Sequence, residues 1–156
     1  MDMDWMFAGD EYICSFRAAG VLVMDGKLLV QREKGGCEYA LPGGHVKVGE
    51  SAGDSLIREF REETGAEIEC ARLLWTEECF WEWNGKKAHN ISFYYLVKLR
   101  PDSYIPEEFA PQRDNPNVLI GWLPIGGLED VTIYPGFIRN EIFDLNAPTR
   151  HFVTRE

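Results

Sequence analysis

Apolar residues gather in short β-type runs near the start of the chain, and two of these runs flank Asp25-Gly26. Asp-Gly between such runs is a strong hairpin signal, because both residues accept the positive φ of a tight turn. We expect strands near residues 15–24 and 27–32. The glycine-rich segment that follows predicts a loop, with at most a short strand around Tyr39.

A helix is predicted over residues 52–64 by signals at both of its ends. Ser51 is a good N-cap, and Asp54 stands three residues later, where it completes a capping box. Gly65 accepts the left-handed conformation that commonly ends a helix.

A long hairpin is predicted around Asn84-Gly85, because Asn-Gly favours a two-residue type I′ turn. In that register Glu82 lies opposite Lys87, and their opposite charges support the pairing. Beyond it we expect a proline-rich loop, a strand and a closing helix, over residues 101–117, 118–125 and 134–145, with Pro135 in the first turn of that helix. Strands outnumber helices, so we predict an α+β protein with a mixed sheet, folded as one domain over residues 1–156.

The predicted helix at 52–64 carries an acidic arc that works against its own stability. At about 100° per residue, Glu59, Glu62 and Glu63 lie together, apart from the apolar arc of the helix. Each like-charge pair three or four residues apart costs about 0.2–0.5 kcal/mol in an isolated helix. A solvated charged face is one interpretation. A divalent cation between the carboxylates is the other, and hard oxygen ligands favour Mg²⁺, with Mn²⁺ as an alternative.

Composition narrows the function further. The 156 residues carry a net charge of −10, which argues against a nucleic-acid polymer as partner, because such binders need a basic face. The four cysteines form no C-x-x-C pair, and the acidic start of the chain lacks the basic region of a signal peptide. We therefore expect reduced thiols and a cytoplasmic location. No apolar run approaches the roughly 20 residues that cross a membrane.

The spacing of residues 44–66 is specific. It reads Gly44, five residues, Glu50, seven residues, Arg58-Glu59-Phe60, one residue, Glu62-Glu63, one residue, Gly65-Ala66. This resembles the signature of the Nudix hydrolase family, of the MutT-like type: G-x5-E-x7-R-E-U-x-E-E-x-G-U, where U is a bulky aliphatic residue. Phe60 and Ala66 are its small departures. At roughly 5–7% usage per residue type, seven fixed matches arise by chance in on the order of one chain per million.

The resemblance implies an α/β/α sandwich of the α+β type, with a mixed central sheet and a catalytic loop–helix–loop at 44–66. It implies hydrolysis of the diphosphate bond in a nucleoside diphosphate linked to another moiety, with Mg²⁺ or Mn²⁺ as cofactor. The substrate is then a small anionic nucleotide, such as a nucleoside triphosphate or a nucleotide-sugar.

On the matching positions, the resemblance implies that Glu59, Glu62 and Glu63 bind the metal. Glu59 and Glu63 rank first, because they project from successive turns of one face. The carbonyl of Gly43 is a further candidate ligand, since glycine lets backbone approach a metal closely. Glu59 and Glu62 are both candidates for handling the proton, and Arg58 is expected to act in catalysis by orienting a carboxylate.

The remaining motif positions are expected to be mainly structural. Glu50 would cap or brace the loop, Gly65 would end the helix, and Gly44 would allow close approach of backbone to substrate. An acidic residue outside the motif often assists in this family. The candidates here are Asp114, Glu107 and Glu108 of the proline-rich loop.

Five residues are candidates for contacting the substrate or a partner. Arg32 ends a predicted strand just before the glycine-rich loop, and Arg17 and His89 could contact phosphates or the base. Trp81 and Trp83 lie near the hairpin turn, where an indole could stack on a base or form a homodimer contact. The other aromatic residues of the hairpin are expected in the core.

Three alternative functions use the same fold. A nucleotide-binding sensor domain without turnover is disfavoured by the intact glutamates, whose mutual repulsion such a domain has no need to keep. An isopentenyl-diphosphate isomerase is disfavoured by the short chain and by the lack of a cysteine in a recognisable catalytic context. An RNA-decapping enzyme is disfavoured by the acidic charge balance.

Overall fold

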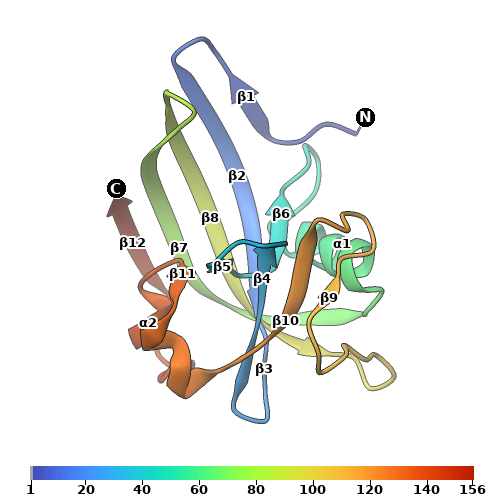
Figure 1. The fold of residues 1–156 in the computed structure, drawn as a ribbon. Helices are drawn as coiled ribbons and strands as arrows, with labels where there is room; N and C mark the ends of the chain where they lie inside the picture. Colours follow the sequence, from blue (N-terminus) through green and yellow to red (C-terminus); the bar gives the residue numbers. More distant parts are fainter. Residues whose placement is uncertain (1) are drawn as a thin grey trace.

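The computed structural model describes residues 2–156, whose strands form two mixed six-stranded sheets (Figure 1). The first sheet has the order β1-β2-β8-β7-β12, with β6 also paired to β2. Its strands are β1 (Met6–Ala8), β2 (Tyr12–Val21), β6 (Gly43–His45), β7 (Ile68–Trp83), β8 (Lys86–Leu99) and β12 (Arg150–Arg155).

The second sheet has the order β11-β5-β4-β10-β9, with β3 paired to β4. Its strands are β3 (Val23–Met24), β4 (Lys27–Glu33), β5 (Glu38–Ala40), β9 (Ala110–Pro111), β10 (Val118–Pro124) and β11 (Thr132–Tyr134). The chain passes from one sheet to the other at Leu22, a buried residue between β2 and β3. The α+β class is thus confirmed, although the strands divide between two mixed sheets rather than forming one central sheet.

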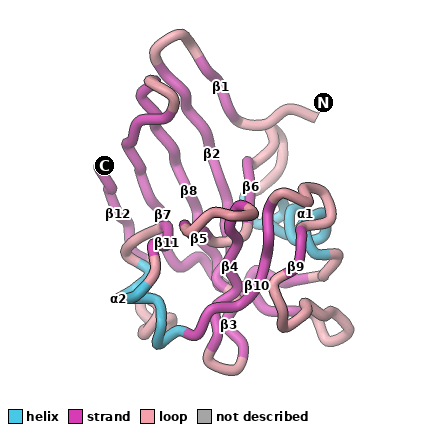
Figure 2. The backbone as a smooth tube through the Cα atoms, viewed as in Figure 1, coloured by secondary structure: helices cyan, strands magenta, loops and turns pink. Residues whose placement is uncertain are grey.

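Helix α1 (Ala52–Thr64) has the predicted bounds, because its signals are local. The Oγ atom of Ser51 accepts a hydrogen bond from the backbone N–H of Asp54 at 3.1 Å, and Gly65 ends the helix with φ 74°. The helix buries Leu56 and Phe60 against the first sheet. In Figures 1 and 2 it lies on one side of the molecule, beside β9 and β10.

The hairpin at Asn84-Gly85 is confirmed. The first hairpin is confirmed only at its turn, because the strand expected at 15–24 divides at Leu22: β2 pairs within the first sheet, and only the two residues of β3 pair with β4. Asp25 and Gly26 adopt φ values of 53° and 73°, and Asn84 turns with φ 49°. Glu82 pairs with Lys87 as expected, while two bulges interrupt the far end of the β7–β8 ladder.

The predicted closing helix at 134–145 is wrong. Helix α2 spans only Ile138–Glu141, Pro135 precedes it, and the chain ends in strand β12, which pairs in parallel with β7. A 3₁₀ helix, η1 (Ile125–Asp130), lies before β11 and α2 in the chain. The apolar spacing of this segment serves tertiary contacts instead, because Ile138 and Ile142 are buried between the sheets and Phe137 stacks on Phe152 of β12 with ring centroids 3.9 Å apart.

Two apolar clusters make up the core. One packs α1 against the first sheet and also includes Leu29 of β4 and Ile120 of β10, and the other lies between the two sheets around Val21, Trp75 and Ile138. Within residues 2–156, no helix has the length and apolar character needed to span a membrane.

Candidate active site

Three carboxylates converge at the solvent side of α1. Ligand-type oxygens of Glu59, Glu62 and Asp114 all lie within 4.8 Å of one another. Asp114 reaches them from the loop after β9 because that loop docks on the C-terminal end of α1, where the backbone N–H of Arg113 donates to the carbonyl of Glu63 at 2.9 Å. The predicted motif acids and one of the three candidate loop acids therefore meet at one place.

Glu63 lies beneath this group and is nearly inaccessible, with 5% of its surface exposed. Its Oε2 atom is buried and has no hydrogen-bond partner among residues 2–156. Burial raises the pKa of Glu63, and the neighbouring Glu59 and Asp114 raise it further, while the charge of Arg17 opposes the shift. Burial also raises the pKa of Glu59, against the effect of Arg58. A buried, partly unsatisfied carboxyl beside other acids is costly unless something else binds there.

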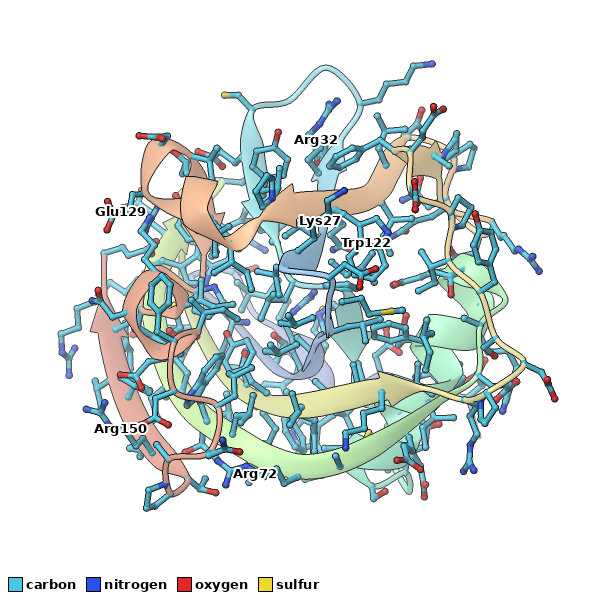
Figure 3. The ribbon with its side chains drawn as sticks, turned by 90° about the horizontal axis from the view of Figure 1, so that it is seen from below. Lys27, Arg32, Arg72, Trp122, Glu129 and Arg150 are labelled. Carbon is cyan, nitrogen blue, oxygen red and sulfur yellow. The ribbon has the colours of Figure 1, made fainter. Side chains whose placement is uncertain are left out.

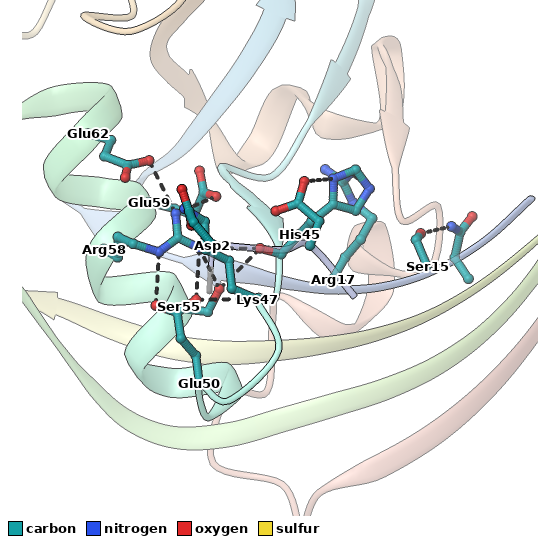
Figure 4. Close-up of polar contacts among 12 residues, drawn as sticks. Asp2, Ser15, Arg17, His45, Lys47, Glu50, Ser55, Arg58, Glu59 and Glu62 are labelled. Carbon is teal, nitrogen blue, oxygen red and sulfur yellow. Dashed lines mark hydrogen bonds and ion pairs between the residues drawn. The ribbon is translucent and has the colours of Figure 1, made fainter. Parts of the chain in front are cut away.

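Arg58 holds Glu50, Glu59 and Glu62 in place (Figure 4). Its guanidinium binds Glu50 through two hydrogen bonds, of 2.9 and 3.0 Å, and reaches Glu59 at 3.1 Å and Glu62 at 3.2 Å. Glu50 also accepts the backbone N–H of Lys47 at 3.2 Å. Glu50 therefore braces both the loop and the arginine, and Arg58 lies where it can orient two carboxylates.

The glycines of β6 allow this approach. A side chain at Gly44 would place its Cβ atom 2.5 Å from the carboxylate of Glu59, and one at Gly43 would lie 2.1 Å from the carbonyl oxygen of Ala18. Gly44 thus leaves room for Glu59 against the backbone, and Gly43 lets β6 lie close to β2. The role of the Gly43 carbonyl as a ligand stays a prediction.

Arg17 connects the acidic cluster, meaning Glu59, Glu62, Glu63 and Asp114, to a cavity. Its Nη1 atom lies 3.4 Å from Nε2 of His45, its partner across β2 and β6. Burial, followed by the charge of Arg17, lowers the pKa of His45 and so favours the neutral ring.

The cavity has a volume of about 590 Å³ and follows one face of the first sheet from Arg17 and His45 towards Trp81 and Trp83. Arg17 and the two tryptophans, all predicted to contact the substrate or a partner, therefore line one concave surface. Sequence reasoning did not identify His45 or the polar strand residues of this face, which include Glu77, Asn90 and Ser92. The sequence did contain a signal for them, because polar residues alternate along β7 and β8. The register of the hairpin brings these polar residues to one face of the sheet.

Other predicted residues lie elsewhere. His89 faces the opposite side of the sheet, where it stacks on Phe80 with ring centroids 4.3 Å apart, because its strand neighbours point into the cavity. Arg32 projects from β4 beside β10 (Figure 3), lines a separate cavity of about 540 Å³, and lies over the ring of Phe109. Glu107 and Glu108 are exposed and do not join the carboxylate group found among residues 2–156.

Comparison with known proteins identifies the family. A family model described as the NUDIX domain matches residues 15–136. MutT4 of Mycobacterium tuberculosis is 27% identical over 128 residues, which cover 75% of this chain and 49% of MutT4, so the chain spans about half the length of that relative. YvcI of Bacillus subtilis, an uncharacterised Nudix hydrolase, is 30% identical over 117 residues, covering 74% of this chain and 70% of YvcI.

Solved structures agree on the fold. The crystal structure of a MutT protein from Bacillus halodurans superposes with a TM-score of 0.61 at 17% identity, covering 89% of this chain and 90% of that one. The family match begins within β2, at residue 15, and includes β3 to α1 and the loop that supplies Asp114. The chain therefore belongs to the Nudix hydrolase family, as a MutT-like member whose signature forms the loop–helix–loop that carries Glu59, Glu62 and Glu63.

Proposed function

We propose that this protein hydrolyses the diphosphate bond of a nucleoside diphosphate linked to another moiety, with Mg²⁺ as cofactor and Mn²⁺ as its substitute. Residues 1–156 would act as one domain. The observation that supports this most is the convergence of Glu59, Glu62 and Asp114 above the buried Glu63. Nucleoside triphosphates and nucleotide-sugars both contain the required bond.

The residues present fit a divalent cation. All the donors are carboxylate oxygens, which suit Mg²⁺ and Mn²⁺ better than softer metals. The unpartnered Oε2 atom of Glu63 is a buried acceptor that a cation would satisfy. When bound there, the cation would offset the repulsion between carboxylates and diphosphate, neutralise charge on the phosphoryl oxygens and acidify a water.

The side chains of this protein supply orientation and a proton acceptor. Arg58, itself held by Glu50, fixes the carboxylates of Glu59 and Glu62. Both remain candidates for taking the proton of the attacking water, and they differ in exposure: the side chain of Glu59 is 15% exposed and that of Glu62 is 43% exposed. Arg17 lies at the boundary between the acidic cluster and the cavity, where its charge can attract the diphosphate.

The test is a substrate panel with Mg²⁺: nucleoside triphosphates, nucleotide-sugars and dinucleoside polyphosphates, scored for release of phosphate, diphosphate or nucleoside monophosphate. We expect turnover of at least one class, abolished by EDTA and restored by Mg²⁺. Turnover that persists in EDTA would contradict the metal dependence. No turnover of any class would contradict the proposal and favour the nucleotide sensor.

A further inference from the structure

A row of polar side chains crosses the first sheet beside the acidic cluster. The register pairs Glu77 with Ser92, Ser92 with Arg17, and Arg17 with His45, over strands β7, β8, β2 and β6. Paired residues project from the same face of a sheet. All four of these side chains line the 590 Å³ cavity.

A second polar row lies two residues further along the same strands. Cys79 pairs with Asn90, and Asn90 pairs with Ser15. All three also line the cavity. The concave face of the sheet is therefore polar over two successive rows, at positions that would carry aliphatic residues if this face were packed as core.

Three of these polar residues are buried and the others are half-buried. In the part of the chain that the structure describes, six polar or charged residues are buried, and three of them, Ser15, Glu77 and Ser92, belong to these rows. Buried polar groups cost free energy unless they are hydrogen-bonded. A cavity of this size, lined largely by apolar and aromatic side chains with a few fixed polar groups among them, is typical of a small-molecule site. The polarity of this face is thus explained by a ligand rather than by packing.

Glu77 is the fixed acceptor in this surface. It is 4% exposed, and its two oxygens accept hydrogen bonds from the hydroxyls of Tyr94 and Thr154, each at 2.7 Å. These bonds fix the orientation of the carboxylate. They leave acceptor capacity, because an ionised carboxylate offers about four lone-pair sites and no donor. The group that Glu77 can recognise in a ligand is therefore an N–H or O–H donor.

Trp81 is also fixed in the cavity. Its indole N–H donates to Asn90, whose side-chain N–H donates in turn to Ser15. The indole is thereby held over the sheet, four residues from Glu77 along β7, or about 13 Å at strand spacing. An oriented indole offers a flat face for stacking on a base.

We propose that this cavity binds the nucleoside part of the substrate and that Glu77 selects it by accepting a hydrogen bond from a donor of the nucleoside. The inference rests on the proposed function, which brings the diphosphate to the acidic cluster. Arg17 then takes the phosphate at one end of the cavity, and Trp81 lies at the other. The donor is either an N–H of the base or a hydroxyl of the ribose, and both satisfy the same acceptor.

The experiment is a calorimetric titration that measures the binding of AMP, GMP, CMP and UMP. Monophosphates contain no diphosphate bond, so binding is measured independently of turnover. We compare wild type, Glu77→Gln and Glu78→Gln. Glu78 is the matched control, because it is the next residue of β7, points to the opposite face, and binds His151 at 2.8 Å.

For the nucleotide that wild type binds best, we expect Glu77→Gln to weaken binding by about ten- to a hundredfold, as for loss of a hydrogen bond to a charged group. Glu78→Gln should bind as wild type does. If the loss disappears for the 2′,3′-dideoxy form of that nucleotide, the ribose is the donor. If the loss persists, the base is the donor.

Equal binding by Glu77→Gln and wild type would overturn the inference, as would the failure of wild type to bind any of the four monophosphates. If either result is found but wild type hydrolyses a member of the substrate panel, the inference about Glu77 fails and the proposed function is retained. If Glu77→Gln did not fold, Glu77→Asp would replace it. That variant keeps the charge but withdraws the carboxylate by one methylene, and the same loss is expected.

Discussion

The acidic cluster beside α1 and the polar rows of the first sheet both contain buried carboxylates, which cost free energy unless they have partners. The two regions differ in whether those carboxylates are hydrogen-bonded. In the cluster, like charges are crowded together and the Oε2 atom of Glu63 has no partner. In the rows, Glu77 has a partner for each oxygen and is only partly saturated. The unsatisfied carboxylates of the cluster support the proposed cation. The satisfied carboxylate of Glu77, which can still accept a further hydrogen bond, supports the proposed selection of a neutral donor.

The largest expected effect comes from removing the charge of Glu63. Glu63→Gln should lower Mg²⁺-dependent turnover by orders of magnitude, because the buried oxygen would no longer attract a cation. The metal-free protein should be as stable as wild type or slightly more stable, since glutamine needs no bound proton to be buried beside Glu59. Steady-state kinetics and thermal unfolding in EDTA measure the two effects.

The control for that variant is Glu67→Gln, three residues beyond the helix end, where an exposed glutamate pairs with Arg61. It removes the same charge without touching the cluster, so turnover should stay near the wild-type value. Unchanged turnover in Glu63→Gln would show that the buried carboxyl is not needed.

The next effect concerns orientation rather than charge. Arg58→Gln should lower turnover by about 10–100-fold and raise the Mg²⁺ concentration needed for half-maximal activity, because Glu59 and Glu62 lose the group that holds them. Arg61→Gln, on the same helix but exposed and bound to Glu67, should change neither quantity. A fall in turnover with an unchanged Mg²⁺ dependence would place the role of Arg58 outside the cluster.

A smaller effect is expected from the close approach of β6 to α1. Gly44→Ala should lower turnover by about tenfold, because the added methyl group would meet the carboxylate of Glu59 and displace it. Gly53→Ala is the control on α1 itself. The atom nearest to its Cβ is the Sγ of Cys70 at 3.9 Å, so this change should leave turnover intact and stabilise the helix by about 0.5–1 kcal/mol. Equal turnover in the two alanine variants would contradict the steric argument.

These comparisons also separate what local sequence determines from what it does not. The bounds of α1 and the register of the long hairpin follow from caps and an Asn-Gly turn, and both were predicted correctly. Strand β12 was missed because its partner β7 lies about 75 positions away in sequence, and a six-residue strand has too short a pattern to compete with the helical spacing before it.

The same distinction holds within the site. Glu59, Glu62 and Glu63 are found by their spacing alone, but the spacing does not show that Glu63 is buried while Glu62 is exposed. That difference depends on how the helix packs in the folded protein, which the spacing does not contain. Glu77 could be recognised only from strand pairings that bring it into one row with Arg17.

The smallest effect, counted per pH unit, is the change of stability with pH in the metal-free protein. Burial and nearby acids raise the folded-state pKa of Glu63 above its ordinary value of 4.5, so above that pH the folded protein keeps a proton that the unfolded chain has released. Stability contributed by this group is fully present below pH 4.5 and is lost as pH rises towards the folded-state pKa, by at most about 1.4 kcal/mol per pH unit. Urea unfolding in EDTA between pH 5 and 8 should therefore show a steeper decline for wild type than for Glu63→Gln. Identical slopes would mean that Glu63 is already ionised when the protein folds, and its burial would then require a compensating charge within the cluster itself.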